Sequence, residues 1–380
     1  MTGTYKEQDL QDLKHQEAEL GEKRERLQRF LADQQFDAIV IARNENIAWA
    51  SGGLVDMRVG VLRETAAGSL LITKGGKAYY LTTENELDRF SEEEFAKLDY
   101  EPLVQPWYAN NVQASIRKAV GNGRVAADVP LDSAELVSLQ PVRLKMTDAE
   151  LLRYRWLGYH AAEAATSVLL RLQPGTSERE MHAMLAERLI SLGILPSVYL
   201  CAADDRIRRY RHAVPRCAVL QRFGMIGFCA RRWGLTVSLT RFVHFGKIPD
   251  ELSDRFSAMA QINAHLLNAT REGISAGDLF TVAAEAYASV GYAGGERLHH
   301  QGGATGYAER EWVARPEGAE RVLSQQAFAW NPSMFGAKIE DTVVLHHGVL
   351  EVLTMTPQLP IVVTEIAGRS YESAGMLAGY

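Results

Sequence analysis

The sequence predicts an α/β domain over residues 1–146, followed by an α+β domain over residues 147–380. In the first part, short apolar runs alternate with helical segments, which is typical of a sheet covered by helices. In the second part, one order of helix, glycine turn, helix and strand occurs twice, which indicates two related halves. A chain of 380 residues has room for two such cores.

The first domain is predicted from a helical start and several strand-like runs. Lys6–Asp33 is rich in Glu, Lys, Gln and Leu, which favours one or two amphipathic helices. Phe36–Ala42 is a compact apolar run that predicts a buried strand. The KGGK segment at residues 74–77 joins two further apolar runs and predicts a hairpin. Arg124–Pro130 predicts another strand.

The second domain opens on a capping-box pattern, Thr147 with Glu150, which predicts a long helix to about Leu172. Three residues then recur at a constant offset of 98 positions: Gly175, Ser177 and Gly193 match Gly273, Ser275 and Gly291. In each copy the serine is a helix N-cap candidate, with Glu180 or Asp278 three residues later. Two copies indicate halves related by a pseudo-twofold axis, because a solenoid needs three or more.

Charge and composition exclude several classes of protein. The net charge of −6 argues against a nucleic-acid-binding surface, which needs a positive excess. The three cysteines, Cys201, Cys217 and Cys229, form no CxxC pair, so we expect free thiols. The charged N-terminus has no signal-peptide core, and no apolar run is long enough to span a membrane. We therefore expect a cytoplasmic protein.

Several segments, in this order, resemble the creatinase, aminopeptidase P and methionine aminopeptidase superfamily. They are ENIAWASGG at 45–53, DRIRRYRHAVP at 205–215, GLTVSLTRFVHFG at 234–246, HHQGGATGYAERE at 299–311, NPS at 331–333 and KIEDTVVL at 338–345. The resemblance covers nearly the whole chain. It implies a pita-bread fold for the second domain behind a smaller creatinase-like α/β domain.

Metallo members of this superfamily bind two divalent ions through two Asp, one His and two Glu. Aligned on the pair Thr240-Arg241, the two Asp positions read Gly227 and Ser238. The His falls on Gly303 within GGATG, the first Glu on Asn331 before Pro332, and only the second Glu is kept, as Glu340. A pair of dications needs several negative charges, and a single carboxylate supplies too few. The resemblance therefore predicts a member without metal, and we expect no other cofactor.

Some relatives, creatinase among them, work without metal and use a histidine as general acid and base. His212-Ala-Val-Pro215 matches the stretch that carries this histidine. An imidazole can give and take protons near neutral pH, so His212 is the predicted catalytic residue. Glu340 is assigned to the catalytic group with it, to orient His212 or to anchor a cationic group of the substrate.

Six further residues are predicted to bind substrate: Arg310, His300, Tyr307, Arg241, Asn331 and Arg58. Arg310 stands where metallo relatives place a second catalytic histidine, and an arginine there can bind a carboxylate. His299 and His300 are expected on opposite faces of a strand, with His300 facing the cleft. Creatinase-like dimers pass residues of the small domain to the neighbouring site, so the resemblance implies a homodimer, with Asp56 or Arg58 as the candidate to line the partner's cleft.

The predicted function is a metal-independent, creatinase-like enzyme that hydrolyses, or eliminates or cyclises at, a C–N bond of a small polar nitrogen compound. Creatine itself is not expected, because creatinase's substrate-site residues fall here on Thr240, Gly303 and Glu340. One alternative is an Xaa-Pro aminopeptidase or dipeptidase that uses divalent metal. Another is a non-catalytic pita-bread binding protein.

Overall fold

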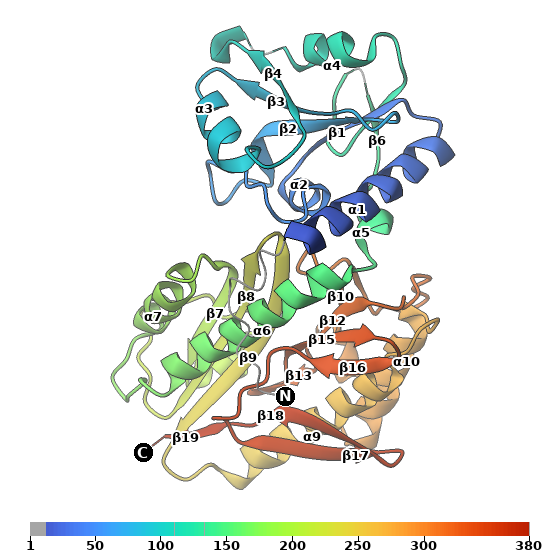
Figure 1. Ribbon diagram of the computed structural model, residues 1–380. Coiled ribbons are helices and arrows are strands. Elements are labelled where there is room, and N and C mark those ends of the chain that lie inside the picture. The colour runs from blue at the N-terminus through green and yellow to red at the C-terminus, as the bar shows by residue number, and fades with distance from the viewer. Residues whose placement is uncertain (1–12, 110, 133, 380) are drawn as a thin grey trace. The chain divides into compact units, whose positions relative to one another are not determined.

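The computed structural model describes residues 13–109, 111–132 and 134–379 of the chain (Figure 1). Internal contacts divide the chain into two units, Met1–Glu150 and Leu151–Tyr380. Each unit has its own sheets and buried apolar core. Among the described residues, no helix combines the length and apolar character needed to cross a membrane.

A six-stranded mixed sheet forms the centre of the N-terminal unit, in the order β4-β3-β2-β1-β5-β6. Its strands are β1 Ala38–Arg43, β2 Thr65–Thr73, β3 Ala78–Thr83, β4 Glu101–Gln105, β5 Val125–Ala127 and β6 Glu135–Leu136. Strand β2 runs antiparallel to β1 and β3, whereas β1 pairs with β5, and β3 with β4, in parallel. The predicted α/β class of this unit is confirmed.

The helical segments of this unit are α1 Leu13–Asp33, α2 Asn44–Ala50, α3 Leu87–Arg89, the π-helix η2 Phe90–Glu94, the 3₁₀ helix η3 Trp107–Ala109, α4 Val112–Val120 and α5 Gln140–Arg143. Helix α1 confirms the predicted helix from residue 13 onward, and residues 6–12 lie outside the described part. The KGGK hairpin joins β2 to β3, and Gly76 has φ +89°, a conformation that glycine adopts readily.

The strand predicted at Arg124–Pro130 is shorter in the structure. Strand β5 ends at Ala127 because Asp128 turns its carboxylate toward the end of β1. There it accepts hydrogen bonds from the backbone N–H groups of Ala42 at 2.8 Å and Arg43 at 3.1 Å. The polar side chain thus ends the strand by binding a neighbouring strand's backbone.

The C-terminal unit is built on two larger sheets, ordered β19-β9-β8-β7 and β11-β10-β12-β15-β16, with the pairs β13-β14 and β17-β18 beside them. The strands are β7 Leu195–Ala203, β8 Phe223–Arg232, β9 Leu235–Phe245, β10 Gly302–Thr305, β11 Trp312–Val313, β12 Gln326–Trp330, β13 Ser333–Met334, β14 Ala337–Lys338, β15 Asp341–His346, β16 Val349–Val352, β17 Ile361–Ile366, β18 Arg369–Ala374 and β19 Leu377–Gly379. A bridge between Thr240 and Glu340 connects the two larger sheets, with Thr240 N donating to Glu340 O at 3.1 Å.

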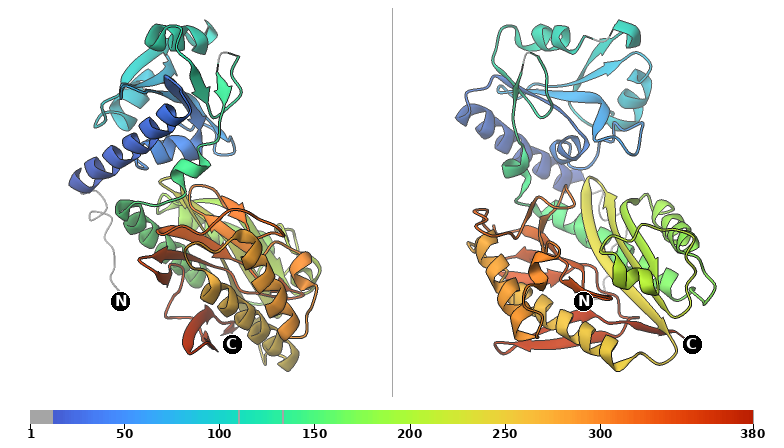
Figure 2. Two further views of the ribbon diagram at one scale, coloured as in Figure 1. Left: turned by 90° about the vertical axis from the view of Figure 1, so that its right-hand side faces the viewer. Right: turned by 180° about the vertical axis from the view of Figure 1, so that it is seen from behind.

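Helices precede each of these sheets in the chain. They are α6 Asp148–Leu169, α7 Glu178–Ile190, α8 Asp205–Arg209, α9 Asp250–Ala269, α10 Ala276–Ser289 and the 3₁₀ helix η4 Gly295–Arg297. Helices α9 and α10, gold to orange, pack side by side in both views of Figure 2. The order α6, α7, then sheet therefore matches the order α9, α10, then sheet, and the predicted α+β class is confirmed.

The two copies of the internal repeat share equivalent backbone hydrogen bonds. Gly175, with φ +103°, donates its N–H to Leu220 O at 2.8 Å, and Gly273, with φ +86°, donates to Val322 O at 2.9 Å. Each glycine therefore turns the chain into the following helix in the same way. The offset of 98 residues in the sequence corresponds to two equivalent corners of the fold.

Ser177 and Ser275 are the N-caps of α7 and α10, and both form complete capping boxes. Ser177→Ala and Ser275→Ala are each expected to lower the free energy of unfolding by about 1 kcal/mol, because each leaves helix N–H groups without a partner. Urea unfolding monitored by circular dichroism measures this. Ser253→Ala, at an exposed position inside α9, is the control. Equal losses in the cap variants and the control would contradict the expectation.

Candidate active site

Three histidines from two loops lie together in the C-terminal unit. His212 follows α8, and His299 and His300 lie between η4 and β10. The Nε2 atoms of His212 and His299 are 3.1 Å apart, within hydrogen-bond distance. The rings of His299 and His300 stack with centroids 4.3 Å apart. The expectation that these two point to opposite faces of a strand is therefore wrong, because both precede β10 rather than belonging to it.

The pKa values of all three imidazoles are lowered. Burial lowers the pKa of His299 to about 3, helped by the charges of His300 and Lys338. Burial, together with Arg310, lowers the pKa of His300 to about 4. Burial and Lys338 also lower the pKa of His212. At neutral pH each ring is uncharged and carries one N–H donor and one lone pair.

The depressed pKa of His299 predicts a pH dependence of stability. The unfolded chain takes up a proton at His299 as the pH falls below about 6.5, whereas the folded chain does so only near pH 3. Stability is therefore complete above about pH 6.5 and falls between there and pH 3. We expect the thermal midpoint to drop less steeply over this window in His299→Gln, with His347→Gln, an exposed histidine, as control. Identical slopes in all three proteins would contradict this.

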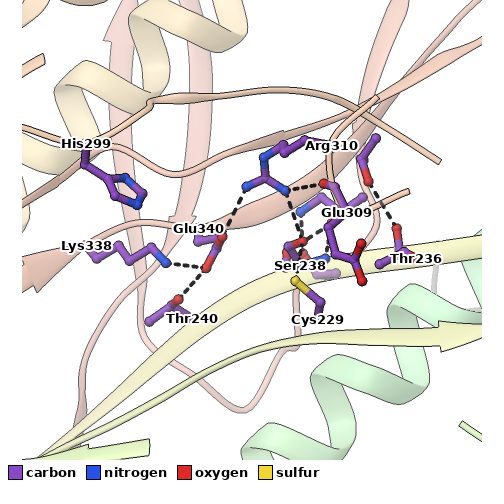
Figure 3. Close-up of polar contacts among 12 residues, drawn as sticks. Cys229, Thr236, Ser238, Thr240, His299, Glu309, Arg310, Lys338 and Glu340 are labelled. Atoms are coloured by element: carbon purple, nitrogen blue, oxygen red, sulfur yellow. Dashed lines mark hydrogen bonds and ion pairs between the residues drawn. The ribbon is translucent and has the colours of Figure 1, made fainter. Parts of the chain in front are cut away.

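Glu340 is buried next to the histidines and is fully engaged (Figure 3). Its Oε2 accepts hydrogen bonds from Thr240 Oγ1 and from Lys338 Nζ, both at 2.6 Å, and its Oε1 lies 3.4 Å from Arg310 Nη2. Burial alone would raise the pKa of Glu340, but the charges of Lys338 and Arg310 outweigh it and lower the pKa to about 2. Glu340 is thus ionised, and two cations share it.

Arg310 is held by a second set of contacts. Its Nη1 donates to Glu309 O at 2.6 Å and to Ser238 Oγ at 3.3 Å, while its Nε has no hydrogen-bond partner among the described residues. Ser238 Oγ is also 3.1 Å from Cys229 Sγ. Burial and the charge of Glu340 raise the pKa of the Cys229 thiol to about 11, so this thiol is protonated at neutral pH.

A cavity of about 140 Å³ lies among these groups. Its polar lining is His212, His300, Glu309, Arg310, Asn331, Lys338 and Glu340, and the rest of its wall is Val198, Leu200, Phe228 and Cys229. Five of the residues predicted for the site, His212, His300, Arg310, Asn331 and Glu340, therefore come together. Their chemical roles stay predictions.

Tyr307 and Arg241 lie outside the lining of this cavity. Tyr307 is completely buried. Arg241 is also buried, and its Nη2 pairs with Asp341 at 2.6 Å, while its Nη1 donates to the backbone oxygens of Thr240 at 2.8 Å and Glu340 at 3.2 Å. These contacts brace the bridge between Thr240, in the middle of β9, and Glu340, directly before β15. The predicted roles of Tyr307 and Arg241 in substrate binding stay predictions.

Arg58 belongs to the N-terminal unit. It pairs with Asp56, and this pairing raises the pKa of the guanidinium. Its predicted position in a partner's site stays a prediction.

Lys338 was not among the predicted site residues, although it is the first residue of the KIEDTVVL motif at 338–345. Lys338 and Glu340 are two positions apart in an extended segment, and residues at that spacing share a face. This alternation was the one local signal for the ion pair. The contact between His212 and His299 had no such signal, because 87 positions separate the two residues.

Two family models match most of the chain. Residues 157–347 match metallopeptidase family M24, and residues 23–150 match the creatinase/prolidase N-terminal domain. The protein belongs to family M24. It is an M24-family hydrolase by class, with the creatinase-type N-terminal domain and the pita-bread domain that the sequence motifs predict.

Solved structures of the same fold include several peptidases. Dipeptidase PepE from Mycobacterium ulcerans superimposes with a TM-score of 0.73 at 17% identity, covering 90% of this chain and 96% of that one. An Xaa-Pro dipeptidase from Bacillus anthracis superimposes with a TM-score of 0.71 at 19% identity, covering 89% of this chain and 98% of that one. The prolidase from Pyrococcus furiosus superimposes with a TM-score of 0.71 at 17% identity, covering 87% of this chain and 100% of that one. At such identities the likeness concerns the fold. No curated protein matches this M24 member in sequence.

Proposed function

We propose that this M24 member is a metal-independent hydrolase that cleaves a C–N bond of a small nitrogen compound, with His212 as general acid and base. The observation that carries the proposal is the state of Glu340. This carboxylate is already bonded to Lys338 and Thr240 and lies next to Arg310, and it faces an uncharged histidine cluster. The M24 family implies a metal pair, so its fit to these residues decides between the alternatives.

The donor set does not fit a metal pair. Among the described residues, no group of three or more His, Cys, Asp or Glu side chains could hold an ion. A dication at Glu340 would lie next to the positive charges of Lys338 and Arg310, which oppose it. Nor is there space for a histidine at Gly303, where a Cβ would overlap the Trp312 carbonyl oxygen and lie 2.7 Å from Val313 Cα. No step is therefore routed through a metal.

The proposed reaction needs only water and the side chains of the cavity. His212 Nε2 is engaged with His299, which leaves Nδ1 as the ring nitrogen for proton transfer. His212 takes a proton from water as the water oxygen bonds to the carbon of the C–N group. It then gives that proton to the nitrogen as the C–N bond breaks, and it ends neutral. Lys338 and Arg310 are the cations of the cavity that can stabilise a negative charge on the substrate.

Metal content and turnover, measured on the same purified protein, test the proposal. Elemental mass spectrometry is run after expression with Mn, Co, Zn and Fe supplied, and small amides, amidines and guanidines are screened for release of amine or ammonia. We expect near-zero metal and turnover that chelators leave unchanged. About two transition-metal ions per chain, with activity lost on chelation, would replace the proposal with a metal-dependent Xaa-Pro peptidase. An open cavity without any turnover in the screen would favour a non-catalytic binding protein.

A further inference from the structure

We infer that the substrate of this site is a small carboxylate, with its anionic group bound beside Arg310 and Lys338 and its C–N bond beside His212. The inference rests on the proposed function and goes further by naming the charge class of the substrate.

The cavity wall, taken together with Arg231 next to it, carries one more positive charge than negative charges. Arg310 and Lys338 are its cations, and Glu309 and Glu340 are its carboxylates. Glu309 is paired outside the cavity lining, with its Oε1 3.1 Å from Arg231 Nη2. Only Glu340 is left to balance two cations. An anion from the ligand would complete the neutralisation.

Both cations keep donor capacity for such an anion (Figure 3). An ammonium has three N–H donors, and the described residues give Lys338 a single hydrogen-bond partner, Glu340, at 2.6 Å. Arg310 reaches Glu340 only at 3.4 Å, which is at the long limit for a hydrogen bond. A carboxylate between the two side chains would receive shorter, charge-assisted hydrogen bonds from both.

The neighbouring histidines experience the same positive excess. Burial lowers the pKa of His212, and Lys338 then lowers it by more than Glu340 raises it. Burial also lowers the pKa of His300, and Arg310 then outweighs Glu340. At both rings a cation thus acts more strongly than the one shared carboxylate.

A second, narrower hollow continues the positive region. Arg211, His299, Ser333 and Lys338 lie in its wall, and Lys338 also lines the main cavity. The rest of the wall is aromatic or apolar: Ile207, Tyr210, Met225, Phe242, Met334 and Ala337. Arg211 donates to Ser333 Oγ at 3.1 Å and forms no ion pair in the described part of the chain. The histidine cluster is therefore bordered by cations on both sides.

The size and the lining of the cavity further restrict the class of substrate that fits. Pockets for drug-sized ligands measure about 300–1,000 Å³, and the cavity of about 140 Å³ is smaller. Val198, Leu200 and Phe228 give it one apolar wall. A guanidinium or ammonium group beside Arg310 would be repelled. Short N-acyl or N-carbamoyl amino acids combine the required carboxylate, C–N bond and size.

Matched probes test the charge class without relying on turnover. N-acetylglycine is compared by titration calorimetry with N-acetylglycinamide, which has nearly the same shape and no charge. We expect the wild-type protein to bind the carboxylate at least about tenfold more tightly. Arg310→Gln and Lys338→Gln each remove the excess charge and are expected to bring the ratio close to one. Glu340→Gln doubles the excess and is expected to raise the ratio.

Arg209→Gln is the control, because Arg209 is an exposed arginine paired with Asp205 at 3.6 Å. Arg310→Gln leaves the Lys338–Glu340 pair intact, so the test survives if the Lys338 variant fails to fold. Equal binding of the two probes, binding of neither at millimolar concentration, or an unchanged ratio in Arg310→Gln would overturn the inference. Carboxylate preference without any hydrolysis would instead reject the proposed hydrolase and leave the binding inference standing.

Discussion

Arg241→Leu is expected to lower the unfolding free energy of the C-terminal unit by about 3–5 kcal/mol. Arg241 and Asp341 form an ion pair in which the side chains are 1% and 5% exposed. Without the guanidinium, the described residues leave the Asp341 carboxylate one side-chain hydrogen bond, from Thr354 Oγ1 at 2.7 Å, and the carboxylate stays buried. Burial already raises the pKa of Asp341, so the variant must either bury an unpaired charge or take up a proton.

Differential scanning calorimetry measures this loss, since 1 kcal/mol shifts the midpoint of a unit of this size by about 2–4 °C. The matched control is Arg209→Leu, whose ion pair with Asp205 is 68% and 78% exposed. Exposed pairs contribute about 0–1 kcal/mol, so the control should melt close to the wild-type protein. A midpoint for Arg241→Leu as high as that of the control would show that the pair does not stabilise the junction of the two sheets.

His212→Asn is expected to slow hydrolysis of any substrate found in the screen by about 10²–10⁴-fold, which is the usual contribution of a general acid–base group. Asparagine keeps hydrogen-bonding capacity but cannot exchange a proton near neutral pH. Binding of N-acetylglycine should change little, because the anion is assigned to Arg310 and Lys338. Steady-state kinetics and titration calorimetry together separate the two effects.

His347→Gln, at an exposed turn between β15 and β16, serves as the control for loss of a histidine. Wild-type kcat in His212→Asn would remove His212 from the mechanism and direct attention to His300, which lines the same cavity. A large loss of binding with unchanged kcat would assign His212 to substrate binding instead.

The sequence by itself determined the class of both units and much of their local structure. Capping boxes at Ser177 and Ser275, the glycine turn at Gly76 and the apolar run of β1 depend on neighbours within a few positions. Signals of this kind are readable because backbone hydrogen bonding and periodicity are local. Family motifs added the place of His212 in the chain.

Only the tertiary structure decided which side chains meet. His212 and His299 meet through their Nε2 atoms, although they lie on different loops. Arg310 likewise lies next to Glu340. Tyr307 and Arg241 are both buried. Such contacts depend on how the sheets pack and pair at Thr240 and Glu340. The charge balance of the cavity and the pKa values of its side chains depend on these distances and on burial. Neither can be read from the spacing of residues along the sequence.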